Sequence, residues 1–296
     1  MPGKLYVVAT PIGNLEDITE RARRTLEEVD IIAAEDTRST KKLLSLLGLR
    51  GRTVSNHKFN EREQADALAA ELLAGKNIAL VSDAGTPCIS DPGWALVSAA
   101  VRNGIEVIGV CGPSAPITAL SVSGFEPTSF AFYGFFPREQ GEALRFINRL
   151  AGADIRVSVC FESPMRMKKT LSLLSEHLPR AELCLCNDLT KLHERIYRGS
   201  PASVLAELEA NPAAEKGEYT LVIHLPIDEA VPEDEADKIS PEALLVDSLV
   251  KNGGTLRDAV ADVHKRLGDE YSKNELYSAS LRLKELLGEL SGDAGR

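Results

Sequence analysis

The sequence lacks long hydrophobic runs: within its 296 residues no apolar stretch approaches the roughly 18 residues of a membrane-spanning helix. Its N-terminus passes directly into a strand-like run, with no region typical of a secretory signal peptide before it. The five cysteines are an odd number scattered among apolar runs, which is typical of reduced thiols rather than a disulfide framework. We therefore expect a cytoplasmic protein that does not enter a membrane.

Several motifs that would identify a cofactor are also missing. The chain has no GxGxxG fingerprint of dinucleotide-binding proteins, and Gly75-Lys-Asn77 lacks the spacing of a phosphate-binding P-loop. It has neither an HExxH motif nor a pair of CxxC motifs. Cys184 and Cys186 share one face of a predicted strand, where two small buried residues are the simpler interpretation. The sequence therefore predicts no metal site.

Net positive charge is absent as well, since the formal net charge is −10. Residues 226–296 contain 16 of the 44 acidic residues but only 9 of the 34 basic ones, so the first 225 residues are close to neutral. Six acidic residues and no basic one fall within 228–237, which predicts a linker over 227–239. A basic patch on the near-neutral part is possible, and the charge does not exclude a nucleic-acid partner.

The first part of the chain alternates strand-like and helix-like runs, which predicts a parallel sheet covered by helices on both faces over residues 1–125. The predicted strands are 4–9, 31–34, 53–56, 78–81 and 105–110. In such sheets ligands bind outside the carboxyl ends of the strands. We therefore look for a site in the loops that follow these strands.

Residues 126–226 form a second predicted α/β domain, in which consecutive strands without an intervening helix indicate a mixed sheet. Its predicted strands are 130–135, 155–161, 181–186, 194–197 and 219–225, and its predicted helices are 141–150, 164–177 and 201–209. After the linker, three amphipathic runs over 240–288 resemble a helix-turn-helix module. The predicted fold class is therefore α/β, with two domains and a small helical module.

Three loops at predicted strand ends are rich in small and polar residues. They are Ala9-Thr-Pro-Ile-Gly-Asn-Leu15, Val81-Ser-Asp-Ala-Gly-Thr-Pro-Cys-Ile-Ser-Asp-Pro-Gly93 and Cys111-Gly-Pro-Ser-Ala115. Asp91 is accounted for as the N-cap of the following helix, whereas Asp83, Gly85 and Thr86 have no such structural explanation. Either these loops are only tight turns, or they leave a shallow slot lined by backbone.

Seven short motifs in series carry a family resemblance. They are Ala9-Thr-Pro-Ile-Gly-Asn-Leu, Glu35-Asp-Thr-Arg, Ser82-Asp-Ala-Gly-Thr-Pro, Gly112-Pro-Ser-Ala, Gly134-Phe-Phe-Pro-Arg, Glu162-Ser-Pro and Leu189-Thr-Lys-Leu-His-Glu. Together they resemble the small-subunit ribosomal RNA methyltransferase I family of the tetrapyrrole-methylase superfamily. The chain departs from the pattern at Pro116, Met165 and Asn187-Asp188.

The resemblance implies a homodimer that uses S-adenosylmethionine, held between two α/β domains, to methylate the ribose 2′-oxygen of a cytidine. The substrate implied is the decoding region of 16S rRNA within the small ribosomal subunit. The cofactor-binding positions it implies are Pro11, Asp83, Ala84, Gly85, Thr86, Pro87, Ile89, Ser114, Ala115, Phe161, Glu162, Leu189 and Thr220.

Methyl transfer to a ribose hydroxyl requires a proton acceptor. The candidates are Asp83, Glu35 and His57, with Asp36 and Glu162 as further carboxylates. Asp83 has an alternative role, which is to brace its loop by accepting backbone N–H bonds.

Residues near the predicted strand ends are also suited to RNA. Arg38 and Lys58 are candidates for phosphate contacts, and Phe59 for stacking on a base. Arg138 and Arg166 are the equivalents in the second domain, and for all of these cations surface ion pairing is the alternative.

Two other functions remain open from the sequence. One is carbon methylation of a tetrapyrrole or of a diphthamide precursor by another enzyme of the superfamily. The other is a non-enzymatic assembly factor that binds RNA through the three-helix module.

Overall fold

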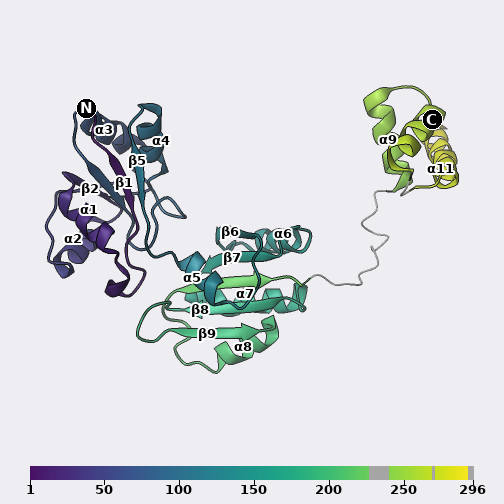
Figure 1. Cartoon of the computed structure of the whole chain (residues 1–296). Coiled ribbons are helices and arrows are strands. Elements are labelled where there is room, and N and C mark those ends of the chain that lie inside the picture. Colours follow the sequence, from purple (N-terminus) through teal and green to yellow (C-terminus); the bar gives the residue numbers. More distant parts are fainter. Residues whose placement is uncertain (227–239, 269–270, 293–296) are drawn as a thin grey trace. The chain divides into compact units, whose positions relative to one another are not determined.

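The computed structural model describes residues 1–226, 240–268 and 271–292 (Figure 1). The chain divides into two compact units, Met1–Ile227 and Asp228–Arg296. The predicted linker over 227–239 lies outside the described residues. No helix in the described ranges has both the length and the apolarity to cross a membrane.

The first unit begins with a five-stranded parallel sheet, as predicted. Its order is β3 (Thr53–Ser55), β2 (Ile31–Ala34), β4 (Ile78–Val81), β1 (Leu5–Val8) and β5 (Val107–Val110). Because side chains alternate along a strand, Ile31 and Ala33 face one way and Ile32 and Ala34 the other. Both faces are therefore buried under helices.

Two pairs of helices cover this sheet (Figure 1). α3 (Glu61–Leu73) and α4 (Trp94–Arg102) contribute Leu68, Leu72, Leu96 and Ala100 to one core cluster. α1 (Glu20–Glu28) and α2 (Thr37–Leu46) contribute Ala22, Leu26 and Leu44 to the other. The short 3-10 helix η1 (Leu15–Asp17) lies in the loop after β1.

α2 begins at Thr37, and the Asp36 carboxylate caps it by accepting the Arg38 N–H at 2.8 Å. The start of α4 differs from the sequence prediction. α4 is not capped by Asp91, because the helix begins only at Trp94, and its N-cap is Gly93 with φ +128°. Asp91 is therefore free for another role.

The second sheet is mixed, as predicted. Its order is β6 (Phe130–Phe135), β7 (Val157–Glu162), β10 (Tyr219–His224), β8 (Glu182–Asn187) and β9 (Arg195–Gly199). The β6–β7 pair is parallel and the other three pairs are antiparallel. One face packs against α6 (Gln140–Ala151), α7 (Pro164–His177) and α8 (Pro201–Glu209).

The other face of this sheet packs against α5 (Ala115–Val122). Ala119 and Leu120 of α5 are buried with Val159 and Val222 of the sheet. α5 follows β5 of the first sheet in the chain, so the peptide that leaves the first sheet is anchored on the second. α5 thus lies on the second sheet although it precedes residue 125, where the sequence places the domain boundary.

The second unit contains α9 (Pro241–Asn252), α10 (Leu256–Leu267) and α11 (Lys273–Gly292) around one small core. α10 begins with a capping box between Thr255 and Asp258. A capping contact also forms at the start of α11, where the Ser272 N–H donates to Glu275 at 2.8 Å. α11 continues to residue 292, beyond the predicted end of the module at 288.

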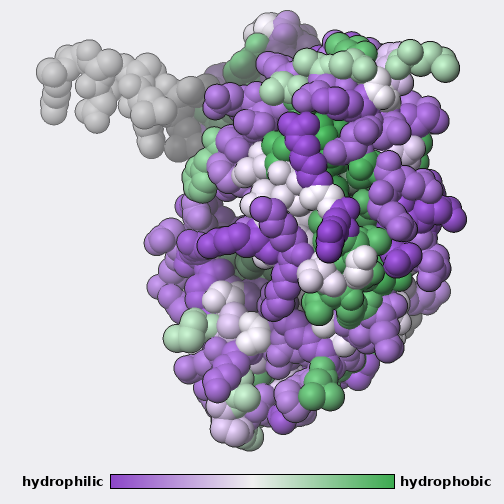
Figure 2. Space-filling view, turned by 90° about the vertical axis from the view of Figure 1, so that its left-hand side faces the viewer, coloured by the Kyte–Doolittle hydropathy of each residue, from purple (hydrophilic) through white to green (hydrophobic). Residues whose placement is uncertain are grey.

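Hydrophilic residues cover most of the face shown in Figure 2, with hydrophobic residues gathered in smaller patches between them. This is the distribution expected when the charged residues lie on the surface of the α/β layers and the aliphatic ones between them.

Candidate active site

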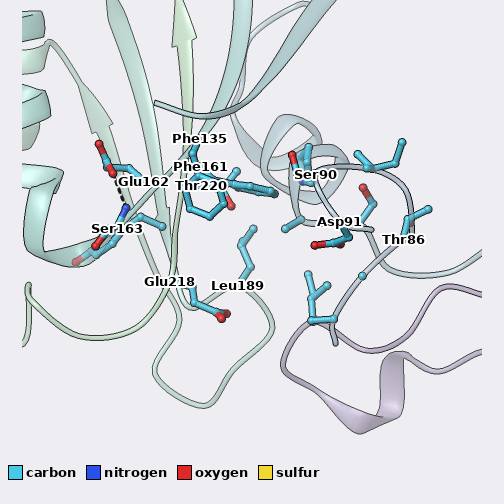
Figure 3. A pocket seen from close by; sticks show the side chains of 18 of the residues that line it. Thr86, Ser90, Asp91, Phe135, Phe161, Glu162, Ser163, Leu189, Glu218 and Thr220 are labelled. Atoms are coloured by element: carbon cyan, nitrogen blue, oxygen red, sulfur yellow. Dashed lines mark hydrogen bonds between the residues drawn. The ribbon is translucent and has the colours of Figure 1, made fainter. Parts of the chain in front are cut away.

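A cavity of about 300 Å³ lies where the loops after β1, β4 and β5 meet the second sheet (Figure 3). Its lining residues are Ile12, Ala84, Gly85, Thr86, Ile89, Ser90, Asp91, Ser114, Ala115, Pro116, Phe135, Phe161, Glu162, Ser163, Pro164, Leu189, Gly217, Glu218, Tyr219 and Thr220. The first sheet therefore supplies its carboxyl-end loops, where ligands of parallel sheets bind. The second sheet supplies the ends of β7, β8 and β10.

Hydrogen bonds join the three loops of the first sheet into one rim. Thr10 and Gly85 exchange backbone bonds of 2.9 and 3.0 Å, which ties the loop after β1 to the loop after β4. The Thr86 hydroxyl donates to the Pro113 carbonyl at 3.2 Å and ties in the loop after β5. Gly85 has φ +78°, a left-handed conformation that costs glycine little. The rim is thus preorganised.

The opposite wall is held by the loop after β8. Lys191 Nζ lies 2.7 Å from Asp188 Oδ1 and 2.8 Å from Glu218 Oε2, which fastens this loop to the start of β10. Burial alone would lower the pKa of Lys191, but the bonds to both carboxylates outweigh it and raise the pKa. Leu189, between these charged residues, is buried and lines the cavity.

The two walls touch at Gly13, in the loop after β1. A Cβ on Gly13 would lie 3.1 Å from the Leu189 carbonyl oxygen and 2.5 Å from Lys191 Cγ. Only a residue without a side chain allows this approach, so Gly13 sets how closely the loop after β1 meets the loop after β8.

Backbone strain gathers at this cavity. In the part of the chain that the structure describes, the non-glycine residues with positive φ are Cys88, Ser90, Asp188 and Thr190. Ser90 lines the cavity, and Asp188 and Thr190 flank Leu189, which also lines it. Conformations of this kind cost energy and are retained mainly at ligand-binding and catalytic sites. The strain therefore supports a functional role for the cavity.

Glu162 ends β7 with a fully buried carboxylate. It forms an ion pair with Arg166 and accepts the Ser163 N–H at 2.6 Å and the Thr170 hydroxyl at 2.7 Å. Arg166 also donates to the Phe136 carbonyl at 3.2 Å. Because its oxygens are already bonded to neighbouring groups of the second sheet and α7, Glu162 shapes the wall of the cavity.

Asp83 and Glu35 brace each other across the loops after β4 and β2. The Asp83 carboxylate accepts the Asp36 N–H at 3.1 Å, and the Asp83 N–H donates to Glu35 at 3.3 Å. Burial raises the pKa of both carboxyls, and the charges of neighbouring acidic residues raise it further. Asp83 thus has the bracing contact that the sequence left as one of two alternatives.

Asp91 is the carboxylate that reaches the cavity from this acidic group (Figure 3). Burial, together with the charges of Glu35 and Asp83, raises the pKa of Asp91 to about 6, while the Ser82 hydroxyl opposes the shift. A group with a pKa near neutrality is suited to exchange a proton at the pH of the cell. The residue first explained as a helix cap therefore has the properties of a catalytic acid or base.

Comparison with known proteins assigns the family. The family model of Tetrapyrrole (Corrin/Porphyrin) Methylases matches residues 4–204. This chain belongs to that family. A protein of Pasteurella multocida named ribosomal RNA small subunit methyltransferase I is 39% identical over 95% of this chain and 98% of its own length. One with the same name from Halalkalibacterium halodurans is 41% identical over 83% of this chain and 81% of its own.

Solved structures agree on the fold. Diphthine synthase aligns with a TM-score of 0.56 at 16% identity, over 75% of this chain and 90% of its own. Uroporphyrin-III C-methyl transferase from Thermus thermophilus, complexed with S-adenyl homocysteine, aligns with a TM-score of 0.50 at 17% identity, over 75% and 97%. Its family and its named relatives make the chain a methyltransferase whose methyl donor is S-adenosylmethionine.

The cavity of this methyltransferase suits such a donor in size and lining. Its volume falls within the range of about 300–1,000 Å³ usual for small-molecule sites. Aliphatic and aromatic side chains such as Ile12, Phe161 and Leu189 supply apolar walls for a nucleoside. The Asp91 and Glu218 carboxylates, which also line the cavity, would attract a cationic sulfur bound there. Among the described residues no cluster of His, Cys, Asp or Glu could hold a metal ion.

The structure brings most of the predicted cofactor positions together. The positions that line the cavity are Ala84, Gly85, Thr86, Ile89, Ser114, Ala115, Phe161, Glu162, Leu189 and Thr220. Pro11, Asp83 and Pro87 do not line it. Pro87 is buried beneath its loop, while Asp83 is exposed and turned to the Asp36 N–H. Binding of the donor by the ten remaining positions stays a prediction.

The predicted RNA contacts are mostly exposed. Lys58, Phe59 and Arg138 are exposed on the surface, and Arg38 is exposed although it pairs with Asp36 at 2.9 Å. Arg166 differs, because its guanidinium is held by Glu162. His57 Nδ1 accepts the Phe59 N–H at 3.2 Å, so this ring nitrogen stabilises the turn before α3. A role for His57 as a base stays a prediction.

Half of the residues that line the cavity are not among the predicted cofactor positions. The additional lining residues are Ile12, Ser90, Asp91, Pro116, Phe135, Ser163, Pro164, Gly217, Glu218 and Tyr219. Ile12, Ser90 and Pro116 are sequence neighbours of predicted cofactor positions, so they could have been predicted to line the site as well. Gly217 and Glu218 gave no signal, because they precede β10 and reach the cavity only through the antiparallel pairing of β10 with β7 and β8.

Proposed function

We propose that this methyltransferase transfers a methyl group from S-adenosylmethionine to the ribose 2′-oxygen of a cytidine in the decoding region of 16S rRNA. The observation that carries the proposal is the convergence of the loops after β1, β4 and β5 on one cavity, in a chain related over nearly its full length to proteins named for small-subunit ribosomal RNA methylation. The proposed substrate is the small ribosomal subunit, and the enzyme acts as a cytoplasmic homodimer.

Catalysis here is mainly alignment. S-adenosylmethionine supplies a methyl carbon already activated by a positively charged sulfur. The rim built from Gly85, Thr86 and the loop after β5 fixes one wall, and Leu189 and Thr220 fix the other. Holding donor and acceptor in line in this way supplies much of the rate acceleration in a displacement reaction.

The attacking hydroxyl must give up its proton, and we assign Asp91 as the acceptor. It lines the cavity, and its pKa of about 6 leaves it ionised at neutral pH and able to take a proton. The carboxylates predicted from the sequence are less suitable, because Glu35 and Asp83 hold each other's loops and Glu162 is bonded on both oxygens. Asp83 and Glu35 then act by raising the basicity of Asp91.

Labelling with a tritiated methyl donor tests the function. Purified enzyme is incubated with unmethylated small subunits, with free 16S rRNA and with a tetrapyrrole precursor in parallel. The proposal predicts label in the RNA of the subunit, on a nucleotide whose 2′-oxygen is methylated. Label in the tetrapyrrole alone would contradict the proposal and would indicate carbon methylation of a tetrapyrrole as the function. If the protein binds RNA but calorimetry detects no heat when S-adenosylmethionine is added, the protein would instead be a non-enzymatic assembly factor.

A further inference from the structure

An exposed tryptophan adjoins the cavity. Trp94, the only tryptophan of the chain, is the first residue of α4 and is 52% exposed. It follows Asp91, which lines the cavity, by three residues. The Arg62 guanidinium lies 5.8 Å from the centre of its ring, within the distance of a cation–π contact. An aromatic face with a cation beside it is therefore presented next to the active site.

A second aromatic side chain extends this surface. Phe59, in the turn before α3, is 95% exposed, and Lys58 beside it is exposed as well. The turn is fixed, since the Phe59 N–H donates to His57 Nδ1 and the His57 N–H donates to Asn60 Oδ1 at 2.7 Å. Phe59 is therefore held out into solvent by an ordered turn.

The starts of α3 and α4 are joined, which brings these side chains to one surface. The buried Glu61 carboxylate accepts the Gly93 N–H at 2.8 Å. Glu61 directly precedes Arg62 in the chain, and Gly93 directly precedes Trp94. Ala65 and Ala69 of α3 pack against Ala95 and Ala99 of α4, and such small residues let the helices approach closely. We call the surface formed by Lys58, Phe59, Arg62 and Trp94 the aromatic strip.

The chemistry of the aromatic strip fits unpaired nucleotides. Aromatic rings stack on exposed bases, and arginine and lysine bind phosphates. Among the ion pairs of the described residues, none involves Lys58 or Arg62, so both charges are available. Duplex bases are already stacked on one another and offer no free face.

Resting on the proposed function, we propose that the aromatic strip binds unpaired RNA nucleotides that flank the methylated one. Phe59 and Trp94 stack on bases, and Lys58 and Arg62 contact phosphates. The strip thereby delivers the target ribose to the cavity at Ile89 and Asp91. Substrate recognition is thus placed on α3 and α4 of the first sheet.

Trp94 fluorescence tests stacking directly, because no other tryptophan contributes. Titration of the full chain with a single-stranded RNA spanning the target should quench the emission, whereas the same sequence annealed to its complement should not. Stacking is worth about 1–3 kcal/mol per base, so Trp94→Ala should raise the KM for RNA by roughly tenfold. Trp94→Phe, which keeps a ring, should largely restore it.

Matched variants separate the aromatic strip from general surface effects. Phe59→Ala and Arg62→Gln should raise the RNA KM and leave kcat and the affinity for S-adenosylmethionine unchanged. A plot of the logarithm of RNA affinity against that of salt concentration should also be less steep for Arg62→Gln, by the amount that about one phosphate contact contributes. Leu73→Ala, at the other end of α3, and Arg102→Gln, at the other end of α4, should match the wild type.

Two results would overturn the proposal while the proposed function stands. The first is normal methylation of small subunits, with no quenching of Trp94 and with an unchanged KM for RNA in Trp94→Ala, Phe59→Ala and Arg62→Gln. The second is loss of a homodimer in Phe59→Ala and Trp94→Ala, seen by sedimentation, with RNA affinity unchanged, which would make the strip a contact between copies. Failure of S-adenosylmethionine binding by the wild type would instead contradict the proposed function.

Discussion

Single residues decide the chemistry of the cavity, and they were the hardest to predict. Gly85 and Thr86 could be found from the sequence, because a glycine-containing polar loop directly after an apolar strand has few structural explanations. Asp91 could not, because Ser-Asp-Pro-Gly is also a typical helix start. The cap is instead Gly93, and the helix begins at Trp94. Environment, which a sequence does not display, gives Asp91 its pKa.

Replacing Asp91 with asparagine tests its role as proton acceptor. The wild-type kcat should rise with pH through about 6 and then level off, since the ionised form is the active one and becomes populated above that pKa. Asp91→Asn should lose this dependence and about 10²-fold or more of kcat at pH 8. Its affinity for S-adenosylhomocysteine should change little, as calorimetry would show. A variant with wild-type kcat would exclude Asp91 as the base.

Gly85→Ala tests the preorganised rim. The positive φ of Gly85 would cost alanine roughly 1–2 kcal/mol, and the new Cβ would lie 3.3 Å from Ile12 Cγ2 inside the cavity. Binding of S-adenosylmethionine should weaken several-fold. Gly104→Ala is the control, because Gly104 has φ +67° and nothing within 4 Å of its Cβ. Equal effects of both variants on binding would show that only backbone strain is involved.

At the scale of elements, the periodicity of the sequence was enough to predict where the strands lie and that those of the first sheet are buried on both faces. Ile31–Ala34 is buried on both faces, and a short apolar run between helical patterns predicts this. The position of α5 was not predictable, because its residues would suit either sheet. Nor was the role of Gly217 and Glu218, which depends on antiparallel pairing between strands distant in the chain.

The network around Glu162 makes β7 and α7 one rigid wall. Arg166→Met should destabilise the chain by about 3 kcal/mol, because it leaves a buried carboxylate without its charge partner. The double variant Glu162→Met with Arg166→Met should recover much of this loss, since no unpaired charge remains. Urea unfolding measures both. A double variant less stable than Arg166→Met would show that the bonds of Glu162 to the Ser163 N–H and the Thr170 hydroxyl outweigh the cost of its unpaired charge.

On the scale of the whole molecule, the residues that line the cavity in the described part of the chain are residues of the first unit. The acidic segment 228–237 allowed the division between the two units to be predicted from composition. What the helical unit contacts could not be read from the sequence, since its capping boxes and small core explain its folding but not a partner.

Removing the second unit tests this independence. A chain ending at residue 226 should fold and bind S-adenosylmethionine with wild-type affinity, because every residue of the cavity is retained. Calorimetry measures the affinity, and the full chain is the control. A truncated chain that is folded by circular dichroism but no longer binds the donor would show that the helical unit completes the site.

A crystal structure of the chain with S-adenosylhomocysteine would show directly where the methyl donor binds. We expect the ligand to occupy the cavity between the Ala84–Ile89 loop and the residues Phe161, Leu189 and Thr220, with its sulfur on the side of Asp91. Density for the ligand elsewhere on the chain, with this cavity filled only by water, would contradict this expectation.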